Sequence, residues 1–331
     1  MNGQTWLNGC QKGTVMILSV SRRTDIPNYY SNWFLNRIKE GFLYVRNPMN
    51  THQISRIDLS PDVVDCIVFW TKNPADMIEK LKYLEDYVYY FQFTLTGYGK
   101  DMEPNLPNKR EELISTFRTL SEKTGKEKVI WRYDPVLLSD RYTVDYHLKA
   151  FEKIASSLAD DTDKVVISFV DLYAKTQRNT KKLGIRQMTK DEMIRLAAQM
   201  AQIASEYHLV IESCAEQIDL QNVGIQHGSC IDKKLIEKLL GCRLRGEKDK
   251  NQREACGCLE SVEVGAYNTC LNGCKYCYAN VNDEKVKENV RLYDQDSPLL
   301  CGNIGPEDKI TDRKVKSLKD PQLSFEMPGI K

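Results

Sequence analysis

The stretch Val63–Pro74, VVDCIVFWTKNP, decides the expected fold, because an apolar run rich in β-branched residues ends there in a polar motif. A run such as Val63–Trp70 is typical of a strand that is buried on both faces of a parallel sheet. Runs of the same character recur along the chain, at Val15–Val20, Val88–Leu95, Val129–Trp131, Val165–Val170 and Leu209–Ile211.

The segments between these runs space their apolar residues three or four positions apart, which predicts amphipathic helices that cover the sheet. The predicted helices are Asn32–Lys39, Ala75–Leu84, Lys109–Glu122, Val144–Leu158 and Lys190–Glu206. Regular alternation of strands and helices predicts an α/β fold, and its length favours one complete or partial β/α barrel of about 250 residues.

Each predicted strand leads directly into a polar motif. These motifs are Ser21–Asp25, Thr71–Pro74, Thr94–Gly97, Arg132–Pro135, Asp171–Tyr173 and Glu212–Cys214. In a β/α barrel the carboxyl ends of the strands form the rim on which active sites are built. The alternative for any one motif is that loops between strands and helices are polar anyway and carry caps and turns.

The composition describes a protein without strong bulk charge. The 331 residues include 47 Lys and Arg against 46 Asp and Glu, for a formal net charge of +1. No segment has the roughly 18 consecutive apolar residues of a membrane helix, and the first residues lack the apolar core of a signal peptide. We therefore expect a cytoplasmic protein with no membrane partner, and one that does not hold nucleic acid by bulk electrostatics.

The cysteines divide the chain into parts. Only Cys10 and Cys66 of the 11 cysteines lie before residue 200, and Cys66 is expected to be a small core residue. In a reducing compartment, crowded cysteines indicate metal or cluster binding before they indicate disulfides. We expect a dispensable, disordered leader (1–14), a barrel body (15–241), a cysteine-rich segment that completes the barrel (242–302) and a C-terminal tail (303–331).

Three thiols fall within one short loop, Cys270-Leu-Asn-Gly-Cys274-Lys-Tyr-Cys277. Three thiolates can hold three irons of a 4Fe-4S cluster and leave the fourth iron without a protein ligand. Gly273 would relax the backbone where the loop turns. The alternative is a zinc site, for which Cys256 or Cys258 would supply the fourth ligand.

This CxxxCxxC spacing, with an aromatic residue just before the last cysteine, resembles the cluster loop of the radical S-adenosylmethionine (SAM) superfamily. The resemblance implies that Cys270, Cys274 and Cys277 bind a 4Fe-4S cluster whose open iron binds SAM, with Tyr276 near the adenine. It also implies an external electron donor such as flavodoxin or ferredoxin. The oligomeric state stays open.

The loop stands near the C-terminus, whereas radical SAM enzymes usually carry it after the first barrel strand. The order of Thr24–Pro27, Thr71-Lys72, Thr94–Thr96 and Arg132–Pro135 resembles the strand-end series of the spore photoproduct lyase and DNA-photolyase-like branch. A circular permutation would explain the difference, with Glu260–Tyr267 supplying the strand that normally comes first. The branch implies a nucleic acid substrate for repair or modification, by analogy alone.

The whole chain is also similar to an uncharacterised bacterial family, a domain of unknown function, with SRRTDIP at its start, WTKNP and RYDP in the middle and a C-terminal cysteine cluster. Met16 to about Asn280 carry this resemblance. The Gly-Gly-Glu motif that contacts the SAM amino group in radical SAM enzymes is missing. Arg22, Arg23 and Asp25 are therefore the candidates for that contact.

Other strand-end residues are candidates for chemistry. Lys72 would pair with the SAM carboxylate or a substrate oxygen, and the alternative is a solvated lysine at the start of a loop. Arg132 and Asp134 are candidate catalytic residues, although an ion pair that holds the rim is the favoured role. Among the histidines, His227 deserves notice because it precedes Cys230 by three residues.

Four further cysteines, Cys214, Cys230, Cys256 and Cys258, are candidates for a second metal site, either a structural zinc or an auxiliary 4Fe-4S cluster. The alternative is that some of them are small buried residues. The overall prediction is a radical SAM enzyme of unknown substrate on a permuted barrel. Its rivals are a zinc- or cluster-stabilised binding module without turnover and an electron-transfer protein with a fully ligated cluster.

Overall fold

A parallel sheet of eight strands forms the centre of the protein. The computed structural model describes residues 16–170, 180, 183–314 and 318. The strand order is β10-β1-β4-β5-β6-β7-β8-β9, and every neighbouring pair is parallel. The strands are β1 (Met16–Val20), β4 (Val64–Thr71), β5 (Tyr89–Thr94), β6 (Val129–Val136), β7 (Lys164–Phe169), β8 (Val210–Cys214), β9 (Gln226–Gly228) and β10 (Val262–Glu263).

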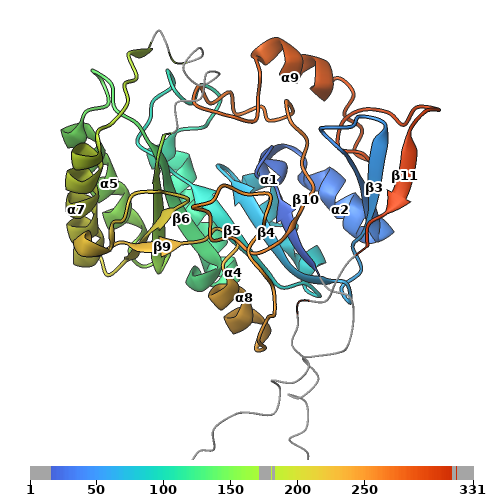
Figure 1. Cartoon of the computed structure of the whole chain (residues 1–331), viewed down its shortest axis with the longest axis horizontal. Helices are drawn as coiled ribbons and strands as arrows, with labels where there is room; N and C mark the ends of the chain where they lie inside the picture. The colour runs from blue at the N-terminus through green and yellow to red at the C-terminus, as the bar shows by residue number, and fades with distance from the viewer. Residues whose placement is uncertain (1–15, 171–179, 181–182, 315–317, 319–331) are drawn as a thin grey trace, which may run out of the picture.

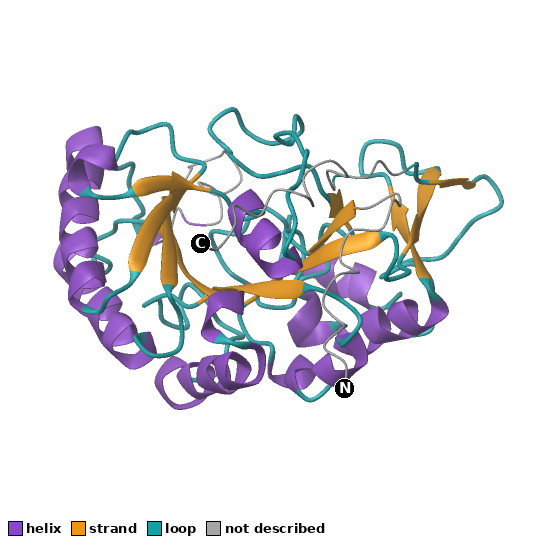
Figure 2. Cartoon of the chain, turned by 90° about the horizontal axis from the view of Figure 1, so that it is seen from below, coloured by secondary structure: helices purple, strands orange, loops and turns teal. Residues whose placement is uncertain are grey.

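The sheet curves into an arc, and the helices that follow its strands lie along the outside of that arc (Figure 2). These helices are α1 (Ile26–Tyr29), α2 (Ser31–Glu40), α3 (Ala75–Ile78), α4 (Ile114–Thr124), α5 (Val144–Leu158) and α7 (Lys190–Glu206). In the described residues the edge strands β9 and β10 do not pair with each other. The architecture is thus a mixed α/β fold compatible with a partial β/α barrel.

The two faces of the sheet have different chemistry, because successive side chains of a strand point to opposite faces. The outer face is apolar and packs against the helices through residues such as Leu18, Phe69 and Trp131. The inner face carries Ile17, Cys66, Val68, Tyr90, Ile130 and Val166 near its base. The expectation that Cys66 is a small core residue is confirmed, since its side chain is fully buried.

A later segment of the chain packs against the inner face. It includes α8 (Lys233–Leu240), whose Ile236 is buried among the inner-face side chains together with Leu244 and Leu259. Asp232 caps the first turn of α8 by accepting hydrogen bonds from the amides of Lys234 and Leu235. The concave side of the sheet is therefore lined by the chain that carries the second cysteine set.

The stretch Glu260–Tyr267 supplies β10, which lies at the edge of the sheet beside β1. Leu18 is in register with Val262, and Ser19 with Glu263. The Glu263 carboxylate accepts hydrogen bonds from the Ser19 hydroxyl at 2.7 Å and the Arg22 amide at 3.0 Å. The stretch does supply a strand, and that strand pairs with β1 at the sheet edge; the circular permutation itself stays a prediction.

A second, smaller sheet flanks the large one on the side opposite α5 and α7 (Figure 1). It contains β2 (Phe42–Arg46), β3 (Gln53–Asp58) and β11 (Lys309–Asp312), with β2 and β3 antiparallel and β11 parallel to β3. Helix α9 (Asp283–Val290) follows the cysteine loop. Shorter helical turns are the 3-10 turns Leu81–Leu84, Lys126–Lys128 and Gln221–Val223 and the π turn Lys109–Leu113.

The predicted strands and helices of the body agree closely with the structure, and Val144–Leu158 and Lys190–Glu206 agree to the residue. The small sheet, α8, α9 and β9 were not anticipated, and β11 lies within the expected tail. The leader 1–14 and the motif Asp171–Tyr173 fall outside the described residues. None of the helices in the described part of the chain is long and apolar enough to cross a membrane.

Candidate metal centre

The loop with Cys270, Cys274 and Cys277 lies over the segment that follows β1. Asn272 joins the two: its amide donates to Asp25 Oδ2 at 3.0 Å, and its Oδ1 accepts from the Tyr29 hydroxyl at 2.9 Å. Tyr30 adds a hydrogen bond to the Thr269 carbonyl at 2.5 Å. These contacts hold the loop at the carboxyl end of β1.

The loop is also fixed internally. Gly273 has a φ of +69°, a left-handed conformation that favours glycine, and a Cβ there would lie 3.0 Å from Asn105 Nδ2. The Asn280 side chain donates to the Cys270 carbonyl at 2.7 Å, and the Cys277 amide to the Cys274 carbonyl at 3.1 Å. The predicted role of Gly273 as a turn residue is confirmed.

Asp25 connects the loop to β4. Its Oδ2 accepts from the Lys72 amide at 2.8 Å as well as from Asn272, and its Oδ1 accepts from the Asn28 amide at 3.2 Å. Burial raises the pKa of this carboxyl group, although these hydrogen bonds oppose the rise. The structure thus brings Asp25 to the loop as expected, but with both oxygens engaged.

Lys72 is not a solvated lysine, and that alternative is wrong. Its Nζ donates to Glu103 Oε1 at 2.7 Å and to the Tyr276 hydroxyl at 2.9 Å, and only 13% of its side chain is exposed. Tyr276 also donates to the Glu103 carboxylate and contacts the ring of Tyr98, with 5.7 Å between ring centroids. The aromatic residue of the cysteine loop is therefore anchored to the end of β4 through Lys72.

Glu103 is the residue that prediction from the sequence missed. It is almost fully buried and lies between the ammonium groups of Lys72 and Lys109. Burial would raise the pKa of its carboxyl group, but the two ammonium groups outweigh burial and lower the pKa to about 2. Glu103 lies in the long loop after β5, among polar residues, and its sequence neighbours give no signal that separates it from a surface carboxylate.

Arg22 and Arg23 lie between the cysteine loop and β10. The Arg23 guanidinium is over the ring of Tyr267 at 4.6 Å and donates to the Gly265 carbonyl at 3.4 Å. The Arg22 guanidinium lies over Trp70 at 5.1 Å, while the Arg22 carbonyl accepts from the Tyr278 hydroxyl at 2.7 Å. Its Nη2 is buried and has no hydrogen-bond partner in the described residues.

Arg132 and Asp134 form the expected ion pair, with 2.9 Å between Arg132 Nε and Asp134 Oδ2. Asp134 also accepts from the Ser168 hydroxyl. The other edge of the Arg132 guanidinium donates to Cys230 Sγ at 2.9 Å and to Gln92 Oε1 at 3.2 Å. The pair therefore lies beside the second cysteine set rather than in the contacts of the cysteine loop.

The second cysteine set comes together inside the arc of the sheet. Cys214 ends β8, Cys230 follows β9, and Cys256 and Cys258 precede β10. Cys214 Sγ and Cys230 Sγ are 3.0 Å apart, and Cys256 and Cys258 belong to the same cluster of buried side chains. All four are buried. The four thiols thus gather in one part of the core.

The sulfurs of neither cysteine group form a finished site for a single ion. In the described part of the chain, no group of three or more His, Cys, Asp or Glu side chains could hold one metal ion as it stands. In the loop, burial, followed by the charge of Asp25, raises the pKa of Cys270 to about 12. Ligation would therefore have to release the thiol protons.

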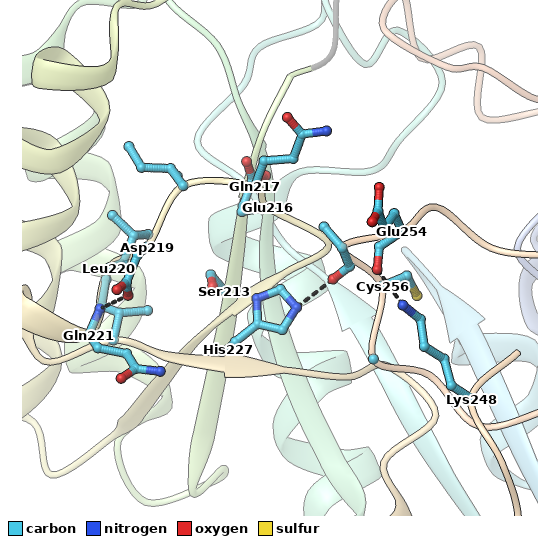
Figure 3. Close-up of a pocket in the computed structure, with 14 residues that line it drawn as sticks. Ser213, Glu216, Gln217, Asp219, Leu220, Gln221, His227, Lys248, Glu254 and Cys256 are labelled. Carbon is cyan, nitrogen blue, oxygen red and sulfur yellow. Dashed lines mark hydrogen bonds between the residues drawn. The ribbon is translucent and has the colours of Figure 1, made fainter. Parts of the chain in front are cut away.

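A groove of about 510 Å³ opens beside the second cysteine set (Figure 3). Cys256 lies in its wall. Beside it, His227 Nε2 donates a hydrogen bond to the Ala255 carbonyl at 2.5 Å. Of the other histidines, His147 lies on α5 as a helix residue but is fully buried. The groove is lined mainly by polar residues after β8 and around Lys248.

Comparison with solved structures finds a putative alpha-L-fucosidase from Bacteroides thetaiotaomicron, which matches 72% of this chain and 87% of that chain. The identity is 11% and the TM-score 0.27, values too low to support an inference about fold or function. No curated protein matches. Residues 17–279 match a family described as "Domain of unknown function (DUF1848)". Since that match covers well over half of the sequence, the chain belongs to the DUF1848 family.

Proposed function

We propose that the protein is a radical SAM enzyme, with Cys270, Cys274 and Cys277 as ligands of a 4Fe-4S cluster. The observation that supports this proposal most is the place of the loop. It lies at the carboxyl ends of β1 and β4, the edge of a parallel sheet on which β/α barrels build active sites.

The number of thiols supports an open iron. The groups whose charges act on Cys274 include Cys270, Cys277, Lys72 and Glu103, and those acting on Cys270 include Asp25 and Cys277. The second cysteine set has its own contacts, between Cys214 and Cys230 and between Cys230 and Arg132. Three protein ligands would leave one iron of the cube for another ligand, as catalytic metal sites require.

Lys72 is suited to bind a carboxylate next to the loop. An ammonium group has three donors, and Lys72 uses two of them, on Glu103 and Tyr276. Lys109 differs, because Glu103, Thr96 Oγ1 and the Tyr98 carbonyl take all three of its donors. Among the described residues, one N–H of Lys72 is therefore left for the carboxylate of SAM.

A reduced cluster bound at this loop would supply one electron to SAM, giving methionine and a 5′-deoxyadenosyl radical that abstracts hydrogen from the substrate. The protein's own part is to position SAM through Lys72 and the segment Arg22–Asp25, and to hold the loop through Asn272. The substrate class is unassigned; nucleic acid is favoured only by analogy. A small electron carrier such as flavodoxin or ferredoxin would serve as the donor.

The decisive experiment is anaerobic reconstitution with iron and sulfide, followed by reduction and assay of 5′-deoxyadenosine over hours. Zinc in place of iron at the loop would favour a binding module. A loaded, reduced cluster that neither binds SAM nor forms 5′-deoxyadenosine would favour an electron-transfer protein, and the enzyme proposal would be falsified.

Two lysine variants test the assignment of the SAM carboxylate. Lys72→Ala should weaken SAM binding about ten- to a hundredfold, since a hydrogen bond to a charged group is worth roughly 1.5 to 3 kcal/mol, and should leave the brown absorbance of the cluster unchanged. Lys109→Ala is the matched control, because it removes the other ammonium group on Glu103 and should leave SAM affinity within about twofold. Equal loss of affinity in both variants would contradict the assignment.

A further inference from the structure

The strongest feature outside the proposed SAM site is the second cysteine set, Cys214, Cys230, Cys256 and Cys258. Its members come from three separate parts of the chain, at the ends of β8 and β9 and just before β10. They lie in one cluster of buried side chains, with 3.0 Å between the sulfurs of Cys214 and Cys230. Four thiols from distant positions meet inside one core, although packing alone would accept any small apolar residue there.

The surroundings of the set suit sulfur atoms that carry negative charge. Arg132 Nη1 donates to Cys230 Sγ at 2.9 Å, and the Ile231 amide donates to Cys258 Sγ at 3.4 Å. Hydrogen bonds from N–H groups to ligand sulfurs are typical of the outer shell of metal sites. Apolar packing would not need these donors.

Arg22 gives an independent observation. Its buried Nη2 lacks a hydrogen-bond partner in the described residues, and Cys258 and Cys230 are the thiols whose charge acts on its guanidinium. A buried donor without a partner costs about 1 to 3 kcal/mol. Four neutral thiols leave this donor without an anionic acceptor, whereas four thiolates around a metal would add negative charge beside it, next to that of Glu263.

We propose that Cys214, Cys230, Cys256 and Cys258 form a second metal centre, closed by four thiolates and separate from the cysteine loop. Four protein ligands leave no open position, which is the arrangement of structural sites. In a tetrahedral site with zinc–sulfur distances of about 2.3 Å the sulfurs lie roughly 3.8 Å apart, so Cys214 and Cys230, at 3.0 Å, would move apart around the ion. Zinc is the expected metal, because it takes four thiolates in closed structural sites. Rotation of the cysteine side chains would bring the four sulfurs around the ion.

The centre would join parts of the fold that the sheet alone leaves apart. Cys214 and Cys230 belong to the β8–β9 edge of the sheet, while Cys256 and Cys258 lead into β10 at the opposite edge. The two segments already meet beside the set, since the Leu259 amide donates to the Ile231 carbonyl at 3.2 Å and a Cβ on Gly257 would lie 3.6 Å from the Gly228 carbonyl. A metal bound by all four thiolates would hold the two edges of the open barrel together.

The test starts from the full-length variant Cys270→Ala/Cys274→Ala/Cys277→Ala, purified anaerobically and analysed for metal per chain by mass spectrometry. We expect about one zinc per chain to remain in it. Adding Cys230→Ala or Cys258→Ala should bring zinc close to zero. Cys66→Ala is the matched control, since this thiol is buried in the same core outside the set, and should keep the zinc.

Because a cysteine variant could fail to fold, a second measurement uses the unmutated second site. Zinc release on titration with a mercurial reagent should follow modification of these four thiols, identified by alkylation and peptide mapping. The proposal would be overturned if the loop variant contained no zinc and no iron, or if Cys214 and Cys230 formed a disulfide instead of binding a metal. About four irons at these cysteines would keep the centre but overturn the assignment to zinc. Since the loop cysteines are absent, failure here is independent of SAM chemistry.

Discussion

The two cysteine groups of this protein differ in position, number and surroundings. The loop cysteines Cys270, Cys274 and Cys277 are half-buried at the carboxyl edge of the sheet, on a loop held by side chains that follow β1 and β4. The second set is buried inside the arc, where its sulfurs contact one another and an arginine. Three thiols at an edge suit a metal centre that also binds a substrate, whereas four thiols in a core suit a metal centre that only stabilises the fold.

The largest expected effect separates the two groups. Cys274→Ala should abolish 5′-deoxyadenosine formation, because no neighbouring residue is placed to replace the lost ligand, and should leave zinc at the second set. Cys230→Ala should remove the zinc and lower the melting temperature while the loop still binds iron when the protein stays folded. Iron, zinc and 5′-deoxyadenosine measured on the same samples check this. If either variant lost both metals while folded, the two centres would not be separate.

A second prediction concerns the buried charges under the loop. Glu103→Gln should lower the free energy of unfolding by about 3 to 5 kcal/mol, because it leaves Lys72 and Lys109 without their shared counter-charge. Urea unfolding of the metal-free protein measures the loss. Glu122→Gln, on an exposed position of α4, should change it by less than about 0.5 kcal/mol. Similar stability of both variants would show that the charges under the loop are well solvated.

Acid should weaken the body of the fold through His147. Burial lowers the pKa of its imidazole to about 4 from the usual 6.5, although a hydrogen bond to the Leu137 carbonyl opposes the shift. Between pH 6.5 and 4 the unfolded chain therefore binds more protons than the folded protein. The folded state has its full stability above pH 6.5 and loses part of it as the pH falls toward 4.

Between pH 7.5 and 5 this loss amounts to about 2 kcal/mol. His147→Gln should be less stable at neutral pH but should lose less stability over that range. Urea midpoints of the metal-free proteins at the two pH values give the comparison. Parallel losses in both proteins would assign the acid sensitivity to other groups.

The smallest effect tests the shape of the loop. Gly273→Ala should cost about 1 to 2 kcal/mol, because an L side chain is strained at a φ of +69°, and its Cβ would also approach Asn105 and Pro104. Gly41→Ala is matched in backbone strain, with a φ of +78°, but has nothing within 4 Å of its Cβ. Only Gly273→Ala should lower the iron bound per chain after limited reconstitution; equal iron in both would show that the turn is not needed for binding.

The strands and long helices could be predicted because the spacing of their apolar residues indicates them. Val144–Leu158 and Lys190–Glu206 also have threonine caps, Thr143 and Thr189, that fix where they begin. The small sheet could not be predicted, since β2 and β3 are short and largely half-exposed, and β11 is mostly exposed. Helix α8, with eight residues, is shorter than the window over which apolar periodicity predicts a helix.

The candidate site was predictable in its residue types but not in its partners. Spacing alone identified the loop cysteines, and strand ends identified Asp25 and Lys72, which the structure brings to the loop. Glu103 and Asn272 were not predicted, because a buried carboxylate and an exposed one look the same in sequence. Arg132 was assigned to the rim, and its contact with Cys230 depends on a residue 98 positions later in the chain.

The hydrogen bonds between Asn272 and the segment after β1 span almost the whole described chain, since Asp25 and Asn272 are separated by 247 residues. During synthesis the ribosome makes β1 and its neighbours first, and the loop emerges only after β9 and α8. The loop can therefore meet the segment after β1 only when most of the chain, β10 included, has been synthesised. If the loop binds the proposed cluster, iron insertion would follow formation of most of the sheet.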